Sequence, residues 1–323
     1  KKKKSILLWS GICSYWSIGV KPWWSKRFLR CEPLVREESL KPSNFDYVKP
    51  KTLEETLTLL GDGGRESVVL AGGQSLMPTL NMRLSAPDLL VDINGLDELS
   101  GVKLEGNQIR IGALTRHVEV ENSSVIAENC PLIALAMPHI AHPAIRNRGT
   151  FGGSIALADP AAELPACICA LEAEIEIVGP GGDRKIAAKD FFKDLYETDL
   201  KDGEIVTAVE IPVTSSKTKI AFDELSRRHG DYAMAGLAVN ATMEDKKIEN
   251  INICFFAISA TPVLAEGAAG ILNNGILDDD SLGKAIQQLE SDLDPLPDLY
   301  ASRALKMHYA KELLKRNLES WMS

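Results

Sequence analysis

The chain has 323 residues, of which 45% are hydrophobic and 25% are charged, and its formal net charge is −9. This length allows two or three domains, and the composition is that of a globular protein able to bury a core. The acidic balance argues against a nucleic-acid-binding protein, which would carry a basic field.

Residues 1–40 differ in character from the rest of the chain. Four lysines, Lys1–Lys4, precede the uncharged run Ser5–Val20, which is the order found in a signal peptide. No A-x-A-like cleavage site comes after this run, and the run is shorter than the roughly 20 apolar residues that a membrane-spanning helix needs. We interpret residues 1–40 as a leader that is disordered or not native, with a targeting segment as the alternative.

Residues 41–97 are predicted to form a small α+β subdomain. Thr52 and Glu55 have the T-x-x-E spacing of a capping box, which predicts a helix that ends at Gly61–Gly64. Short buried strands are expected at "SVVL", just before a pair of glycines, and within Asp88–Leu96.

Residues 98–215 are predicted to form a second subdomain, with strands at "NQIRIGALT", "AEIEIVG" and Glu204–Val213. The six cysteines of the chain are scattered and have no metal-cluster spacing, so Cys167 and Cys169 are read as small core residues. Sparse cysteines suit a reducing compartment, and we expect a cytoplasmic protein.

Residues 216–323 are predicted to form a third α+β unit. "IAFDELSRR", "AMAGLAVNATM" and "IENINICFFAIS" are expected to be three antiparallel strands, followed by helices near Asp280–Leu293 and Leu299–Met322.

Two loops contain adjacent glycines flanked by hydroxyl side chains: "AGGQS" at 71–75 and "TFGGS" at 150–154. Glycines allow backbone N–H groups to converge on an anion, and hydroxyls add donors, so the two loops together are predicted to hold a pyrophosphate. For either loop alone, an ordinary turn is the alternative. Neither loop has the GxGxxG or GxxxxGK[ST] pattern, so the sequence does not favour a Rossmann or P-loop site.

Several polar residues lie near the second loop. Asp159 and Glu163 are expected to accept hydrogen bonds from ribose or ribityl hydroxyls, because carboxylates do not favour phosphate. His139 and His142 are not expected to bind a metal, since prolines break the helix that would align them. For the arginines of "IRNRG", phosphate neutralisation and solvation both stay open.

Four motifs occur in order: "AGGQSLMPTLNMRL", "HPAIRNRGTFGGSIALADPAAELP", "GEIVTAVEIP" and "RRHGDYAMAG". Together they resemble the FAD-binding medium subunit of the molybdenum hydroxylases, the family of carbon monoxide dehydrogenase and xanthine dehydrogenase, over nearly all of the chain after the leader. The resemblance implies an α+β fold. A two-subdomain FAD-binding domain of the vanillyl-alcohol oxidase type would span residues 41–215. A C-terminal domain of the carbon monoxide dehydrogenase flavoprotein type would span residues 216–323.

The resemblance also implies a site for non-covalent FAD. In it, Val206 matches an aliphatic residue close to the flavin, and Tyr232 matches a tyrosine that stacks on the flavin ring, an ordinary core tyrosine being the alternative. The expected FAD-binding residues are Ala71, Gly72, Gly73, Gln74, Ser75, Leu76, Thr150, Phe151, Gly152, Gly153, Ser154, Asp159, Glu163, Val206 and Tyr232.

This sequence departs from the family in one place that bears on the site. Xanthine dehydrogenase relatives have a lysine near the flavin where this chain has Asp223 or Glu224. Electrostatic tuning of the flavin ring by a lysine is therefore in doubt for this chain. No cysteine spacing for an additional iron–sulfur cluster occurs, so neither a cluster nor a metal is expected in this chain.

The function implied is that of an oxidoreductase subunit that passes electrons through FAD to an external acceptor, with no catalytic acid or base of its own. The expected partners are a small subunit with [2Fe–2S] clusters and a large subunit with the molybdenum cofactor, assembled as a dimer of heterotrimers in the cytoplasm or, through partners, at the inner face of the membrane. The alternatives are a self-sufficient flavin oxidase or dehydrogenase and a non-catalytic nucleotide-binding assembly protein.

Overall fold

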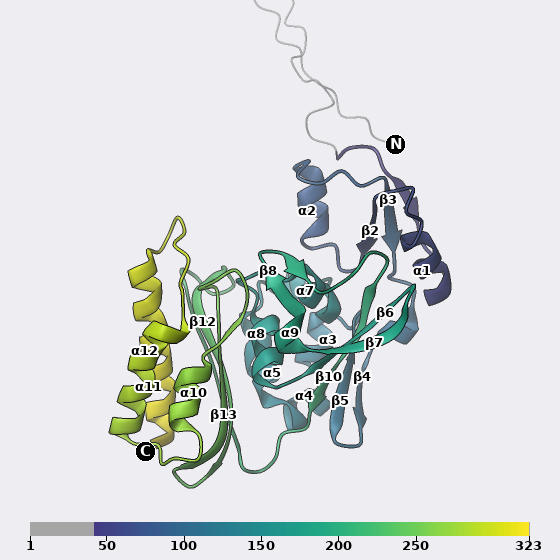
Figure 1. Cartoon of the computed structure of the whole chain (residues 1–323). Helices are drawn as coiled ribbons and strands as arrows, with labels where there is room; N and C mark the ends of the chain where they lie inside the picture. Colours follow the sequence, from purple (N-terminus) through teal and green to yellow (C-terminus); the bar gives the residue numbers. More distant parts are fainter. Residues whose placement is uncertain (1–41, 323) are drawn as a thin grey trace, which may run out of the picture. The chain divides into compact units, whose positions relative to one another are not determined.

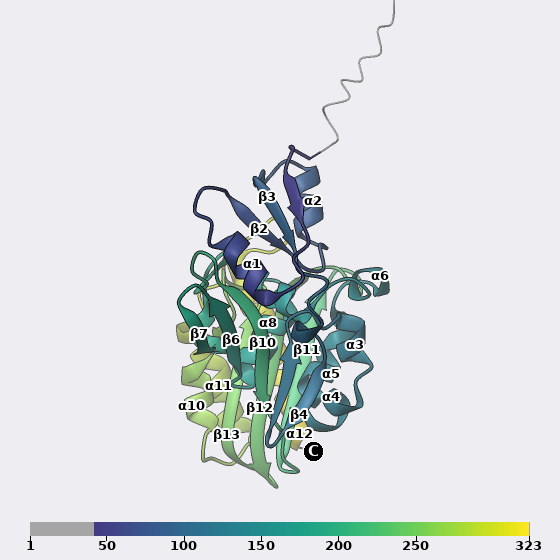
Figure 2. The ribbon, with the colours of Figure 1, turned by 90° about the vertical axis from the view of Figure 1, so that its right-hand side faces the viewer.

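A computed structural model describes residues 42–322, so the expected leader lies outside the described residues. Within residues 42–322 the chain forms three main sheets and one two-stranded hairpin (Figures 1 and 2). Helices and strands are mixed throughout, as the α+β prediction requires.

The first sheet is three-stranded and parallel, in the order β1-β3-β2. Its elements are β1 (Asp46–Val48), α1 (Leu53–Leu60), β2 (Ser67–Leu70), α2 (Leu76–Asn81) and β3 (Leu89–Asp92). The hydroxyl of Thr52 accepts a hydrogen bond from the backbone N–H of Glu55 at 3.1 Å, so the predicted helix start is confirmed. The Glu55 carboxylate accepts from the N–H of Lys51 instead of Thr52, one residue before the position a capping box requires.

The second sheet is five-stranded and antiparallel, in the order β4-β5-β10-β6-β7; Figure 2 shows β7, β6 and β10 side by side. Its strands are β4 (Val102–Glu105), β5 (Gln108–Gly112), β6 (Glu174–Gly179), β7 (Gly182–Ala187) and β10 (Ile205–Pro212), and β8 (Phe192–Asp194) pairs with β9 (Glu197–Thr198) in the hairpin. Its helices are η1 (Asp97–Leu99), α3 (His117–Glu121), α4 (Ser124–Asn129), α5 (Pro131–Ala136), η2 (Met137–His139), α6 (Pro143–Arg146), α7 (Phe151–Leu157), α8 (Glu163–Ala170) and α9 (Ala188–Phe191).

The third sheet is antiparallel, in the order β11-β12-β13-β14. Its elements are β11 (Thr218–Ser226), β12 (Ala233–Glu244), β13 (Lys247–Phe256), β14 (Val263–Leu264), α10 (Glu266–Leu272), α11 (Asp279–Asp292) and α12 (Arg303–Met322). The three expected strands are present. The edge strand β14 was not expected, because a two-residue strand has no periodicity to detect.

Helix α8 lies at the centre of the fold. It packs against β12 and β13 on the face of the third sheet opposite α10 and α12 (Figure 1). Because α8 lies between two sheets, its residues Leu164 to Ala170 are buried, Cys167 and Cys169 among them as free thiols. Among the described helices, none is long and apolar enough to cross a membrane.

Candidate functional site

The two glycine loops meet at one cavity of about 620 Å³, a size within the usual range of about 300–1,000 Å³ for small-molecule sites. Its walls come from the first sheet, from the segment around α6 to α8, and from the turn between β11 and β12. The predicted residues that line it are Ala71, Gly72, Gly73, Gln74, Ser75, Leu76, Thr150, Gly153, Ser154, Asp159, Glu163 and Tyr232. The structure therefore brings most of the predicted residues together.

The first loop offers backbone donors. Gly73 has a φ of +70°, a left-handed conformation that turns the chain between β2 and α2 and that glycine adopts without steric cost. The N–H groups of Gly72, Gly73, Gln74 and Ser75 donate no hydrogen bond within residues 42–322. A run of unpaired N–H groups around a left-handed residue forms an anion-binding concavity, so this loop fits a phosphate group.

The side chains of the first loop have separate roles. The Gln74 amide donates to the carbonyl of Gly72 at 3.0 Å, so it stabilises its own turn. The exposed Ser75 precedes α2, and its hydroxyl accepts no capping hydrogen bond from the backbone of that helix, so the hydroxyl is available to a ligand. Leu76 adds apolar surface to the cavity.

The second loop offers hydroxyls rather than backbone donors, which differs from the expectation of the same chemistry twice. Phe151 donates its N–H to the carbonyl of Thr115 at 2.9 Å, and Gly152 donates to Ala113 at 2.9 Å. The N–H of Gly153 is bonded to the Thr150 hydroxyl oxygen at 3.2 Å. The donors left for a ligand are the hydrogen of the Thr150 hydroxyl and the hydroxyl of Ser154, one helical turn further along. The Ser154 hydroxyl has no hydrogen bond within the described residues.

The glycines of the two loops are required for different reasons. A Cβ on Gly72 would lie 2.6 Å from the carbonyl oxygen of Arg148, so Gly72 allows the two loops to touch. A Cβ on Gly152 would lie 2.4 Å from the Cβ of Ala113, so Gly152 allows α7 to pack on the end of β5. Only Gly153 of the second pair lines the cavity.

Two carboxyl groups lie on the other side of the cavity. Asp159 accepts a hydrogen bond from the N–H of Ala161 at 2.9 Å, and burial raises the pKa of its carboxyl. Burial raises the pKa of Glu163 to about 8, with the nearby charges of Glu224 and Asp159 adding to the effect. Glu163 is therefore protonated at neutral pH and can donate a hydrogen bond to a ligand oxygen.

Tyr232 lies at the cavity with 72% of its surface exposed, so its ring is available to stack on a planar ligand. Tyr196, at the tip of the β8–β9 hairpin, places its hydroxyl 3.5 Å from Asp159 at the same rim. Tyr196 could not be predicted because it belongs to none of the four motifs, although it lies only seven residues before "GEIVTAVEIP".

Three predicted residues lie elsewhere. Phe151 and Gly152 are buried and hold α7 in place. Val206 is 5% exposed in β10, at an irregularity in its pairing with β6, and belongs to the hydrophobic core. None of the three lines the cavity.

Among the residues that line the cavity and were not predicted, His117 stands out. Its Nε2 lies 3.0 Å from the carbonyl oxygen of Thr150, so Nε2 carries the hydrogen, while Nδ1 is buried without a partner. Burial lowers the pKa of His117 to about 4, so the ring is neutral. Gly230 and Asp231, next to Tyr232, also line the cavity.

Of the two arginines whose role was left open, Arg146 has a carboxylate partner, and the two acids at the family's lysine position are paired as well. Arg146 is buried and pairs with Glu121, with its Nε 2.8 Å from Oε2. Asp223 pairs with Arg316 at 2.5 Å, Glu224 with His139 at 3.3 Å, and neither acid lines the cavity. Within residues 42–322, no group of three or more His, Cys, Asp or Glu side chains could hold a metal ion.

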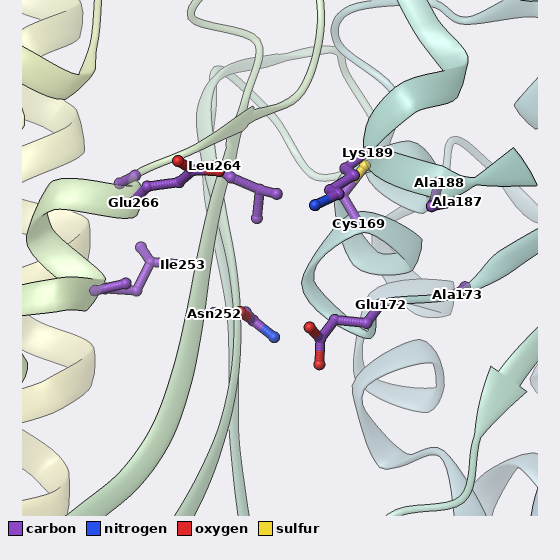
Figure 3. Close-up of a pocket in the computed structure, with 12 residues that line it drawn as sticks. Cys169, Glu172, Ala173, Ala187, Ala188, Lys189, Asn252, Ile253, Leu264 and Glu266 are labelled. Atoms are coloured by element: carbon purple, nitrogen blue, oxygen red, sulfur yellow. The ribbon is translucent and has the colours of Figure 1, made fainter. Parts of the chain in front are cut away.

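A second, smaller cavity of about 340 Å³ lies between α8 and β13 (Figure 3). Figure 3 shows Glu172 and Asn252 pointing toward each other across it, and the side-chain nitrogen of Asn252 is buried without a partner. It contains neither glycine loop, so it does not share the chemistry of the first cavity.

The fold and the larger cavity define a class. An α+β chain in which a loop of unpaired N–H groups faces free hydroxyls, beside apolar surface and an exposed aromatic ring, fits a nucleotide cofactor with a pyrophosphate and a planar ring.

Comparison with known proteins identifies the family within this class. Residues 43–214 match the FAD binding domain in molybdopterin dehydrogenase, and residues 220–321 match the CO dehydrogenase flavoprotein C-terminal domain. The chain belongs to the FAD-binding medium subunits of the molybdenum hydroxylases. It contains an FAD-binding domain and is a subunit of an oxidoreductase.

Three relatives illustrate the match. The chain is 39% identical to the 6-hydroxypseudooxynicotine dehydrogenase complex subunit alpha of Paenarthrobacter nicotinovorans, over 86% of this chain and 95% of the relative. It is 36% identical to the carbon monoxide dehydrogenase medium chain of Afipia carboxidovorans, over 86% and 96%. A solved carbon monoxide dehydrogenase structure from Hydrogenophaga pseudoflava superposes with a TM-score of 0.84 at 34% identity, covering 86% of this chain and 97% of that one.

Proposed function

We propose that this chain holds FAD non-covalently in the 620 Å³ cavity and passes electrons from the [2Fe–2S] clusters of a small partner subunit to an external acceptor. A large partner subunit with the molybdenum cofactor would oxidise the substrate, and the complex would be a dimer of heterotrimers. The redox chemistry is supplied by FAD when it is bound, and the chain supplies binding and orientation.

The observation that supports this assignment best is the pairing of the two loops at one cavity. The N–H groups of Gly73, Gln74 and Ser75 would hold one side of the pyrophosphate, and the hydroxyls of Thr150 and Ser154 the other. Hydrogen bonds to a charged oxygen contribute about 1.5–3 kcal/mol each, so a few of them give stable binding.

The remaining cavity residues would orient the cofactor. Tyr232 would stack on the flavin ring, and Leu76 would cover apolar surface. Asp159 and Glu163 would bond the hydroxyls of the polyol or ribose, Asp159 as an acceptor and the protonated Glu163 as a donor.

We also propose the three-part division at residues 41–97, 98–215 and 216–323. The three main sheets fall within these limits, which supports the division. A cytoplasmic location is proposed on the scattered cysteines, of which the four in the described residues are free thiols.

The first experiment purifies the full chain alone and with its partner subunits. We expect a yellow chain with bound FAD that does not oxidise substrate until the iron–sulfur and molybdenum subunits are added. Substrate oxidation by the isolated chain would instead support a self-sufficient flavin enzyme. A chain that rejects FAD would contradict both.

The second experiment tests the loop. In Gly153→Val, the new Cβ would lie 2.6 Å from the Thr150 hydroxyl oxygen, and its methyl groups would enter the space between the loops. We expect loss of bound FAD, measured by flavin absorbance per chain. Gly270→Val is the matched control, because Gly270 also lies in a helix and a Cβ there meets nothing within 4 Å. Normal FAD content in Gly153→Val would remove the second loop from the site.

A further inference from the structure

A chain of side-chain hydrogen bonds connects the two glycine loops, and it starts at Asn94, just after β3. The Asn94 amide nitrogen donates to the carbonyl oxygen of Ala71, the first residue of the first loop, at 2.7 Å. The same nitrogen lies 2.6 Å from Oδ1 of Asp92. The other oxygen of Asp92 accepts from the Tyr47 hydroxyl at 2.5 Å. Asn94 is therefore held firmly on the first sheet.

Arg116 continues the connection to the second loop. Its Nη2 donates to the side-chain oxygen of Asn94 at 2.6 Å, and its Nη1 donates to the carbonyl oxygen of Arg148. The backbone around Arg116 also pairs with the second loop, through a bridge to Thr150. Ala71, Asn94, Arg116 and Arg148 thus form one connected path from loop to loop.

Neither Asn94 nor Arg116 lines the cavity, and both side chains are half-buried. Within this path they contact the loops only at backbone carbonyls, so they affect where the loops lie and not which groups face a ligand. The planar guanidinium of Arg116 spans two acceptors at fixed geometry, which a flexible ammonium group does not do.

We infer that Asn94 and Arg116 are positioning residues that set the spacing of the two glycine loops for cofactor binding. The inference rests on the proposed function, because it takes the two loops to be the FAD-binding loops. Loops that are already in place when the ligand arrives need no ordering on binding, and a supporting shell of this kind holds binding groups within about 0.5 Å of their required places.

The test measures the dissociation constant for FAD, by flavin fluorescence quenching on the full chain freed of cofactor, for Asn94→Leu, Arg116→Met and the double variant. We expect each single variant to raise the dissociation constant at least fivefold. The double variant should be no more than about threefold weaker than the weaker single variant, because the path is already broken once. A smaller change in either single variant, or losses that multiply in the double, would overturn the inference.

Arg116→Lys separates geometry from charge. Lysine keeps the positive charge but cannot reach both Asn94 and Arg148 with a rigid fork, so we expect the same loss of at least fivefold. Affinity restored to the wild-type value would show that only the charge matters and would overturn the inference. Asn94→Asp still accepts from Arg116 but cannot donate to Ala71, and it places a carboxylate oxygen against Oδ1 of Asp92, so it should also weaken binding at least fivefold.

The controls separate a positioning role from simple loss of stability. Arg110→Met removes a different half-buried arginine contact, between Arg110 on β5 and Glu176 on β6 at 2.7 Å, and should leave the dissociation constant within twofold. In the cofactor-free Arg116→Met chain, amide hydrogen exchange should rise at the hydrogen-bonded N–H groups of the second loop, Phe151 to Ser154, and not in β13. Unchanged exchange in that loop would count against the inference.

Gly153→Val is measured in parallel. If Gly153→Val loses FAD while the Asn94 and Arg116 variants bind normally, only the positioning inference fails. If Gly153→Val also binds FAD normally, the assignment of the cavity is what fails.

Discussion

Glu163 provides a prediction that does not depend on any bound cofactor. Burial raises the pKa of its carboxyl to about 8 from the ordinary 4.5, with Glu224 and Asp159 contributing. Because the folded-state pKa lies above the unfolded-state value, the folded chain holds a proton that the unfolded chain releases. Stability is therefore lost as the pH rises from about 4.5 to about 8, and the loss levels off above that range.

The substitution Glu163→Gln removes this titration while keeping the size of the side chain. With pKa values of about 8 and 4.5, linkage gives about 2.5 kcal/mol of lost stability for the wild-type chain between pH 6 and pH 9. We expect the free energy of unfolding of Glu163→Gln, relative to wild type, to rise by about this amount over the same interval. Subtracting the two curves cancels most of the contribution of other groups.

The assay is urea unfolding of the cofactor-free full chain, followed by circular dichroism at several pH values from 6 to 9. Glu105→Gln is the control for replacing a glutamate by a glutamine, because Glu105 is exposed at the end of β4 and does not line the cavity. A difference between Glu163→Gln and wild type that stays constant over this range would refute the conclusion that Glu163 is protonated at neutral pH.

Two further predictions concern one aromatic ring and one buried charge. Tyr232→Ala should raise the dissociation constant for FAD about tenfold, and Tyr232→Phe should leave it within twofold, because stacking needs the ring and not the hydroxyl. Equal losses of affinity in the two variants would contradict stacking. The buried Lys306 lies 2.7 Å from Asp298 and 2.8 Å from a main-chain carbonyl oxygen, so Lys306→Met should cost about 2 kcal/mol in urea unfolding. Lys311→Met, which breaks the pair with an exposed Glu290, should cost less than about 0.5 kcal/mol; similar costs would contradict the role of burial.

The glycine loops show what composition can and cannot predict. Adjacent glycines beside hydroxyl residues were enough to predict that the two loops act together, and both loops line one cavity. Their separate roles depend on contacts that composition does not contain: Gly72 lies against the backbone at Arg148, and Gly152 lies against Ala113. The strands could be predicted because burial of one face of a strand leaves an alternating pattern of apolar residues in the sequence.

Asn94 and Arg116 could not be predicted from the sequence. Each bonds to residues more than 20 positions away, and neither belongs to a motif with a known spacing. Phe151 and Val206 show the opposite problem. They lie within motifs that mark the site, yet their side chains are buried in the core, because a motif also contains the residues that hold its loop in place.

The cavity draws its walls from residues 68–85, from residues 117–163 and from Gly230 to Tyr232. The first two segments contact each other directly, and Gly230 to Tyr232 are brought to them by the third sheet, which packs against α8. A cofactor that needs all three walls therefore binds the finished chain and not its fragments. At a free concentration 100 times its dissociation constant, such a ligand favours the folded state by about 2.7 kcal/mol. Uptake of FAD would then mark the chains that have completed folding, and cellular flavin supply would set how many of them persist to meet their partner subunits.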